Sequence, residues 1–248
     1  MLRETDGFPI VYDCHDWLRG FSAMAGEIVA AEADSLRTAD LVLFTSEQLR
    51  DRHCVSAKWM VSRNAVDLSH FRTVVSEPPG APLVAGYVGA LDAWFDIESL
   101  VEAARANPTC HFVIAGRIEN PAIRELKPLP NVEFVGEVEY DQLPKLMASF
   151  RVGLIPFSVN ELTIAVNPIK LYEYFSLGLP VVSSPLPEVQ RMGGLVRLAD
   201  NPASFAAEVR AALTEDDPRL RSERIRIAAS ESWASRAQDI AARFARLL

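Results

Sequence analysis

The sequence predicts an α/β fold in which a doubly wound parallel sheet is accompanied by part of a second domain of the same kind. From residue 82 onward, short apolar runs rich in Val, Ile and Phe alternate with longer segments of helical period. This alternation is typical of βαβ units around a parallel sheet. Each run is bounded by Gly, Pro or Asn, which interrupt regular structure. A shorter alternation of the same kind occupies residues 8–66.

The larger domain is expected to contain six strands and at least four helices. We predict the strands at 83–89, 111–116, 132–136, 152–157, 179–183 and 195–198. The helices are predicted at 97–106, 141–149, 168–177 and 202–213. Asp96 stands directly before the first of these helices and is a suitable N-cap, because its carboxylate can accept from free N–H groups of the first turn.

The amino-terminal part shows the same alternation of strands and helices as the larger domain, but with fewer elements. Strands are predicted at 9–14, 40–46 and 58–66, with a helix around 27–38, and three strands do not complete a doubly wound domain. We therefore divide the chain into a partial segment (1–72), a proline-containing linker (73–82), the larger domain (83–230) and a terminal helix (231–248). That helix carries one apolar stripe, which we expect to be covered: Trp233, Ala237, Ile240, Ala241 and Phe244.

Composition excludes several classes of protein. The 248 residues include 33 acidic and 25 basic side chains, a formal charge of −8, which argues against a nucleic-acid-binding protein. Cys14, Cys54 and Cys110 form no C-x-x-C pair, so the sequence indicates neither a zinc clip nor a disulfide framework. The sequence shows no signal-peptide pattern or apolar run of membrane-spanning length, and we expect a cytoplasmic protein; attachment to a membrane surface stays open.

The stretch 160–189 is the most informative for chemistry. It leads from one strand through a loop into a helix that begins at the carboxyl edge of the predicted sheet, with Asn167 as N-cap and Pro168 as first helical residue. Ligands of such sheets bind at this edge, and a helix N-terminus attracts anions. Lys170 and Glu173 share a stripe with Asn167, so they could hold a diphosphate and the hydroxyls of a ribose. The alternative is an ordinary exposed ion pair on a helix.

Several segments, in order along the chain, resemble retaining glycosyltransferases of family 4, which have the GT-B fold. The segments are 40-DLVLFTSEQLRD-51, 63-RNAVDLSHF-71, 87-YVGALDAWFDIESLVEAA-104, 167-NPIKLYEYFSLGLPVVSS-184 and the helix around Trp233. The likeness covers the chain from about Val11 to its end. It implies two Rossmann-like domains that face each other across a cleft, with the nucleotide-sugar on the carboxyl-terminal one. The amino-terminal acceptor domain is represented only by about its last third.

The resemblance also implies roles for individual residues. Glu173 matches a glutamate that contacts ribose, and Lys170 and Asn167 would lie near the diphosphate. The loop that starts at Gly89 would border the phosphates. The backbone of Val135, Gly136 and Glu137 would meet the base. The alternative for Gly89, Gly116 and Gly136 is that they only end strands.

The sequence departs from the family pattern at the site. The family's first motif glutamate would fall at Ala165, and we consider Glu161 its substitute, with Lys170 as the second catalytic residue. Residues 90–95 lack the basic pair found in many relatives, which leaves Lys170, Arg117 and helix N–H groups to neutralise a diphosphate. His15 and Asp16 end the first strand, where an acceptor-side base could stand, although a histidine there is more often structural.

These observations favour a glycosyltransferase that moves a sugar from a UDP-, GDP- or dTDP-sugar to a hydroxyl acceptor in glycan or polysaccharide biosynthesis, without metal or cofactor and with retained anomeric configuration. The alternative is a non-catalytic nucleotide-sugar-binding or scaffold subunit. Because an incomplete sheet leaves unpaired edges, we expect a homodimer or a partner chain that completes the amino-terminal domain. A dehydrogenase is disfavoured, since only 86-GYVG-89 stands where a G-x-G-x-x-G turn would be needed.

Overall fold

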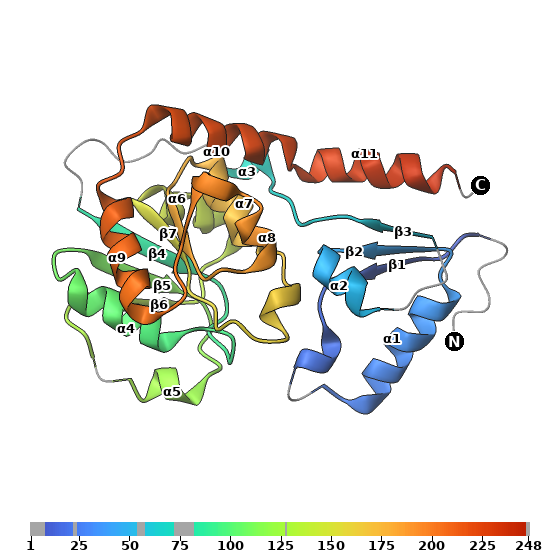
Figure 1. The fold of residues 1–248 in the computed structure, drawn as a ribbon, viewed down its shortest axis with the longest axis horizontal. Helices are drawn as coiled ribbons and strands as arrows, with labels where there is room; N and C mark the ends of the chain where they lie inside the picture. Colours follow the sequence, from blue (N-terminus) through green and yellow to red (C-terminus); the bar gives the residue numbers. More distant parts are fainter. Residues whose placement is uncertain (1–7, 22–23, 54–57, 72–81, 127, 247–248) are drawn as a thin grey trace.

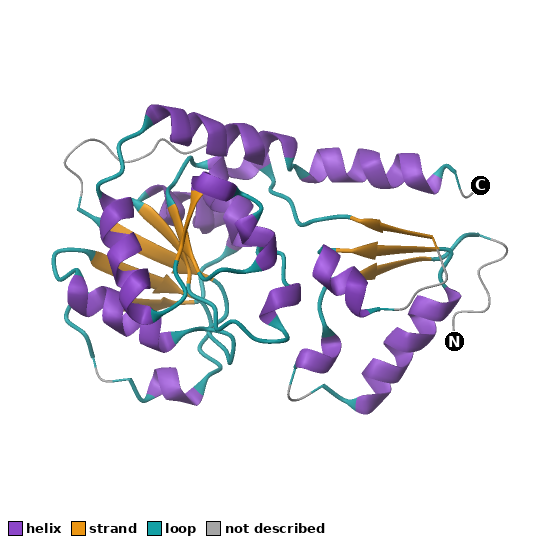
Figure 2. Cartoon of the chain, viewed as in Figure 1, coloured by secondary structure: helices purple, strands orange, loops and turns teal. Residues whose placement is uncertain are grey.

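The computed structural model describes residues 8–21, 24–53, 58–71, 82–126 and 128–246. They form two parallel sheets with a helix pair that runs along both (Figure 1). Figure 2 shows the larger sheet enclosed by helices and the smaller sheet as a separate layer beside it. The predicted fold class is therefore confirmed. Most of the predicted linker, residues 73–81, lies outside the described residues.

The larger sheet contains six strands in the order β6-β5-β4-β7-β8-β9. They are β4 (Val84–Val88), β5 (His111–Ala115), β6 (Val132–Gly136), β7 (Val152–Ile155), β8 (Val181–Ser183) and β9 (Val196–Leu198). All neighbouring pairs are parallel, and the chain order reverses between β4 and β7. All residues of β4, β7 and β8 are buried, because helices cover both faces of the sheet. The six predicted strands are thus confirmed.

Helices cover the two faces of this sheet in two groups. One group is α4 (Ile97–Ala106), α5 (Pro121–Arg124) and α9 (Pro202–Leu213); the other is α6 (Leu143–Ala148), α7 (Ile169–Ser176), α8 (Pro187–Gln190) and α10 (Pro218–Ser230). The predicted N-cap of α4 is confirmed, since Asp96 accepts a hydrogen bond from the N–H of Ser99 at 3.0 Å. Helix α7 begins at Ile169, with Pro168 at the N-cap position and no side-chain cap.

The smaller sheet has the order β1-β2-β3, again parallel. Its elements are β1 (Val11–Cys14), α1 (Gly26–Thr38), β2 (Leu41–Phe44), α2 (Glu47–Arg52) and β3 (Lys58–Val61), followed by α3 (Leu68–Phe71). Every residue of the central strand β2 is buried, whereas β1 and β3 are partly exposed. Among the described residues β1 pairs with β2 alone, so its outer edge carries no ladder.

The terminal helix α11 (Trp233–Phe244) continues from α10 and passes beside β3 (Figure 1). Ser232 forms an isolated parallel β-bridge with Val66. Nε of Arg236 donates a hydrogen bond to the carbonyl of Arg63 at 2.9 Å. The expectation that the apolar stripe of this helix is covered holds only in part for the described part of the chain. Trp233, at 41% exposed, stands free with Ala237 and Ala241, whereas Ile240 and Phe244 are half-buried. No helix among the described residues is long and apolar enough to cross a membrane.

Candidate active site

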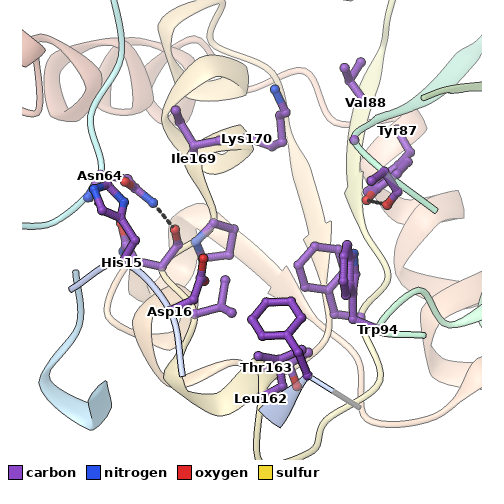
Figure 3. A pocket seen from close by; sticks show the side chains of 17 residues that line it. His15, Asp16, Asn64, Tyr87, Val88, Trp94, Leu162, Thr163, Ile169 and Lys170 are labelled. Carbon is purple, nitrogen blue, oxygen red and sulfur yellow. Dashed lines mark hydrogen bonds between the residues drawn. The ribbon is translucent and has the colours of Figure 1, made fainter. Parts of the chain in front are cut away.

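A cavity of about 280 Å³ opens between the two sheets (Figure 3). The small unit contributes His15, Asp16, Phe21 and Asn64 to its walls. The larger unit contributes the carboxyl end of β4, the loop after β7 and the start of α7. The cavity therefore lies at the carboxyl edge of the larger sheet, next to the point where the strand order reverses, which is where open α/β sheets bind ligands.

A second cavity of about 210 Å³ adjoins the first and shares Val88, Gly89 and Ala90 with it. Its other walls come from the ends of β5 and β6 and from α6, and include Arg117 and Glu137. The guanidinium of Arg117 pairs with Glu119 and lies 4.0 Å from the carboxylate of Glu137. The two cavities together form an elongated space for a ligand on both sides of the Gly89 loop.

Lys170 and Glu173 form an ion pair on the first turns of α7. Nζ of Lys170 lies 2.8 Å from Oε2 of Glu173, and Lys170 lines the larger cavity. Glu173 is buried, and its Oε2 accepts no hydrogen bond of good geometry from the described residues. A carboxylate oxygen has more than one lone pair, so Glu173 keeps acceptor capacity beside its ion pair, although only Lys170 of the two lines the cavity. The ion pair is therefore not the exposed surface pair of the alternative interpretation.

Asn167 lines the larger cavity, and its predicted place near a diphosphate stays a prediction. It is not the N-cap of α7, because Pro168 occupies that position. Its Oδ1 accepts from the backbone N–H of Asn64 at 2.9 Å, and its Nδ2 donates to the hydroxyl of Tyr172 at 3.0 Å. These bonds to groups of both units hold the start of α7 in place.

The loop between β7 and α7 is fixed by its own hydrogen bonds. Oδ1 of Asn160 accepts from the N–H groups of Leu162 and Thr163, and the Thr163 hydroxyl donates to the Ser158 carbonyl at 2.6 Å. Ala165, where the first family glutamate would stand, is buried, and its carbonyl accepts from Ser46 at 2.6 Å.

Glu161, the predicted substitute for the missing glutamate, is exposed on this loop. It lines a third cavity of about 410 Å³, beside the cavity that holds Lys170. Phe21, Trp94 and Leu162 line both cavities. The structure thus does not bring Glu161 and Lys170 into one cavity, and the role of Glu161 stays a prediction.

Three glycines stand where strands of the larger sheet end. Gly89 lines both adjoining cavities, and Gly116 approaches its carbonyl so closely that an added Cβ would lie 1.9 Å from that oxygen. Gly116 and Gly136 also have positive φ angles, of +142° and +75°. Gly116 is therefore required for packing against the Gly89 loop. Val135, next to Gly136, is 37% exposed, so its surface is free for a flat ligand.

His15 has a partner that the sequence analysis did not name. Its Nε2 lies 2.9 Å from Oδ2 of Asp13, and this hydrogen bond raises the pKa of the imidazole. Asp16, beside it in the cavity wall, is half-buried, and this burial raises the pKa of its carboxyl. The spacing D-x-H in a strand could have shown the pair, because residues two apart point to the same face.

The sequence analysis also missed an aromatic wall. Phe21, Trp94 and Phe157 line the cavity, and the rings of Phe21 and Trp94 meet edge to face with centroids 6.2 Å apart. Trp94 lies in the segment that lacks the basic pair. The wall is therefore apolar and flat at the place where many relatives have the basic pair. Such a surface suits the face of a sugar ring better than a phosphate.

Comparison with known families decides the assignment of the chain. Residues 82–215, more than half of it, match the family described as glycosyl transferases group 1. The chain belongs to this family. The matched region contains the six-stranded sheet and the Lys170–Glu173 pair.

This glycosyl transferase group 1 chain has a curated relative in Bacillus subtilis (strain 168), the putative teichuronic acid biosynthesis glycosyltransferase TuaH. The two are 26% identical over 252 residues, which cover 90% of this chain and 64% of TuaH. The chain therefore spans less than two thirds of the length of this relative.

Solved structures of the GT-B type share the fold. Anabaena Alr3699/HepE, in complex with UDP and glucose, superposes with a TM-score of 0.74 at 20% identity, over 96% of this chain and 71% of that one. Sucrose-phosphate synthase from Thermosynechococcus elongatus gives a TM-score of 0.75 at 17% identity, over 96% and 67%. At these identities the likeness establishes the arrangement of the two Rossmann-like units alone.

Proposed function

We propose that the protein transfers a sugar from a nucleoside diphosphate donor to a hydroxyl acceptor in polysaccharide biosynthesis. The observation that carries the proposal is the buried Glu173 carboxylate, paired at 2.8 Å with the Lys170 ammonium, which lines a cavity at the carboxyl edge of the sheet. A donor of this class combines hydroxyls that such a carboxylate can bind with a diphosphate that the ammonium can neutralise.

In this proposal the donor extends across both adjoining cavities. The base and ribose occupy the smaller cavity near Val135, Gly136 and Glu137, and Glu173 accepts from the ribose hydroxyls. The diphosphate passes the Gly89 loop and meets Lys170 and the N-terminus of α7. Negative charge grows on the diphosphate as the glycosidic bond breaks, so a fixed cation and a helix end stabilise the transition state more than the ground state. Arg117 adds a second cation, and the scheme requires neither a metal nor a cofactor.

The sugar and its acceptor would meet in the larger cavity. Phe21 and Trp94 offer ring faces to the sugar, and His15 and Asp16 approach from the acceptor side. We include retained anomeric configuration in the proposal, with Glu161, four residues before Ala165 in the sequence, in place of the missing family glutamate. UDP is the preferred nucleotide of the proposal, since HepE was solved with UDP and with UDP-glucose. A role in polysaccharide biosynthesis is supported by the relative TuaH, a putative teichuronic acid biosynthesis glycosyltransferase.

A specific observation favours a second candidate, a donor-binding subunit that acts only with a partner. Strand β1 has an unpaired outer edge among the described residues, and Val11 on it is 37% exposed. Sugar transfer by the isolated chain would contradict this candidate. Transfer that requires a second copy or another chain would support it.

Calorimetric titration with UDP, GDP and dTDP tests the donor site. We expect UDP to bind, and Lys170→Ala and Glu173→Ala each to weaken it by at least about tenfold, since a hydrogen bond to a charged group contributes roughly 1.5–3 kcal/mol. Lys145→Ala is the matched control, because Lys145 is exposed on α6. The affinity of this variant for UDP should equal that of the parent. Unchanged affinity in both site variants would contradict the assignment.

Turnover experiments test the catalytic part separately. NMR of the product of a UDP-sugar reaction should show the anomeric configuration of the donor. Glu161→Gln should lower turnover without a change in the affinity for UDP, because the proposal places Glu161 near the sugar and not near the nucleotide. An inverted product would contradict the retaining mechanism. A fully active Glu161→Gln variant would remove Glu161 from it.

A further inference from the structure

Three potential metal ligands converge in the small unit, away from the proposed donor site. Sγ of Cys14 lies 3.8 Å from Oε1 of Glu32 and 3.8 Å from Nε2 of His53. The three ligand atoms all lie within 4.8 Å of one another. Cys14 is the last residue of β1, Glu32 is in the middle of α1, and His53 follows the end of α2. The cluster thus joins the three elements on one side of the smaller sheet.

The distances fit a tetrahedral metal ion. Zinc binds cysteine sulfur at about 2.3 Å and histidine nitrogen at about 2.0–2.1 Å, so two such ligands in a tetrahedron stand roughly 3.5–3.6 Å apart. The observed 3.8 Å separation of Sγ and Nε2 needs a closure of only a few tenths of an ångström. A thiolate, an imidazole and a carboxylate are a ligand set suited to zinc.

The thiol and the carboxylate of this cluster are buried, and a buried carboxylate without a cationic partner is unusual. Cys14 is 1% exposed and Glu32 is 5% exposed. No ion pair of Glu32 is found among the described residues, and its hydrogen bonds come from the thiol and, at 3.5 Å, from the hydroxyl of Tyr12. A buried carboxylate usually has a cation beside it, because an uncompensated buried charge is costly. A bound dication would supply that charge.

The surroundings hold the ligands in place and leave one coordination position accessible. The His53 ring stacks on Phe44 with centroids 5.8 Å apart and meets the Trp17 ring edge to face at 5.3 Å. Glu32 and His53 line a cavity of about 400 Å³, which has room for a water ligand. Three arginines also line this cavity: Arg19, Arg37 and Arg52. They do not exclude a dication, because thiolate and carboxylate together bring two negative charges and make the centre neutral.

We propose that Cys14, Glu32 and His53 bind one zinc ion, with water as the fourth ligand. Binding forms the zinc–sulfur bond and releases the thiol proton of Cys14 to solvent. The ion ties α1 and the end of α2 to β1. This small unit has a limited apolar core, and a structural metal is a common means of stabilising such a unit.

Cobalt substitution in the full chain tests the site. All proteins carry Cys54→Ser, so that only the thiols of Cys14 and Cys110 remain. After removal of metal with a chelator, we expect one equivalent of Co²⁺ to give a thiolate-to-cobalt charge-transfer band and the visible bands of a four-coordinate ion, and zinc to displace it. Cys14→Ser should abolish the charge-transfer band. Cys110→Ser is the matched control and should bind as the parent does, since Cys110 is a buried thiol of the larger unit.

Glu32→Gln and His53→Ala complete the test. Loss of a partner outside the ligand set already costs roughly 10–100-fold in metal affinity, so loss of a ligand should cost more than about 100-fold. Glu32→Gln keeps the size of the side chain, so it remains informative if Cys14→Ser does not fold. Zinc should raise the melting temperature of the parent and leave that of Glu32→Gln unchanged. Absence of a charge-transfer band in the parent, or its persistence in Cys14→Ser, would overturn the proposal. UDP binding is independent of these outcomes.

Discussion

Asn64 holds Asn167 through two hydrogen bonds that join the two units at the wall of the cavity. The backbone N–H of Asn64 donates to Oδ1 of Asn167 at 2.9 Å, and Nδ2 of Asn64 donates to the Asn167 carbonyl at 2.6 Å (Figure 3). Asn64 follows β3, whereas Asn167 precedes α7. The position of the helix that carries Lys170 therefore depends on the small unit.

We expect Asn64→Ala and Asn167→Ala each to lower the free energy of unfolding by about 1–3 kcal/mol. Asn64→Ala removes the donor of the Asn167 carbonyl, and Asn167→Ala removes the acceptor of the Asn64 N–H and the donor of the Tyr172 hydroxyl. Urea unfolding of both single variants and the double variant should show a coupling of about 0.5–3 kcal/mol between the two sites. Asn64→Ala combined with Asn201→Ala is the control. Asn201 caps α9 and shares no partner with Asn64, so these effects should add within about 0.5 kcal/mol. Strict additivity of the Asn64 and Asn167 effects would contradict the coupling.

Helix α10 carries a buried and an exposed arginine, and we expect only substitution of the buried one to lower the free energy of unfolding. Nη1 of Arg224 lies 2.6 Å from Oε1 of Glu215, and Nε donates to the Leu195 carbonyl at 3.0 Å. Arg224 is 1% exposed, so Arg224→Ala should lower the free energy of unfolding by about 3–5 kcal/mol. Arg226 on the same helix pairs with Glu223 at the surface, and Arg226→Ala should leave the urea midpoint unchanged. Equal midpoints for the two variants would show that the buried pair is not stabilising.

The contact of Gly116 with Gly89 gives a prediction for both stability and ligand binding. Gly116→Ala places a Cβ 1.9 Å from the Gly89 carbonyl oxygen at a φ of +142°, so overpacking and backbone strain together should cost about 2–5 kcal/mol. Because Gly89 lines both cavities, the affinity for UDP should also fall. Gly194→Ala is the control, since nothing lies within 4 Å of its Cβ. If the Gly116→Ala protein is as stable as the parent, the Gly89 loop moves aside without loss of stability and the prediction is wrong.

The sequence predicted the elements that local patterns determine. The apolar runs identified all six strands of the larger sheet, because strands buried on both faces read as continuous hydrophobic segments. The N-cap role of Asn167 was predicted wrongly, since its partner Asn64 lies 103 residues away and meets it only when the two units dock. The partial covering of α11 had the same cause: periodicity shows that Trp233 lies on an apolar stripe, but not whether anything packs on that stripe.

The pair His15–Asp13 should make the small unit sensitive to pH. The hydrogen bond to Asp13 raises the pKa of His15, partly opposed by burial. A histidine whose pKa is higher in the folded than in the unfolded state adds stability below its unfolded pKa, and loses this contribution as the pH rises through the folded value. Asp13→Asn should therefore be less stable than the parent at about pH 5.5, where the ring is charged, and equally stable at about pH 8.5.

NMR titration of the His15 ring measures the same effect directly, and Asp13→Asn should move its pKa downward. Asp34→Asn is the matched control, because Asp34 pairs with Arg37 on α1 and not with His15. It should leave the His15 titration unchanged. If the activity of the protein depends on an uncharged His15, the acid limb of its pH–rate profile should move to lower pH in Asp13→Asn as well. A His15 titration that is identical in the parent and in Asp13→Asn would show that the 2.9 Å contact does not persist in solution.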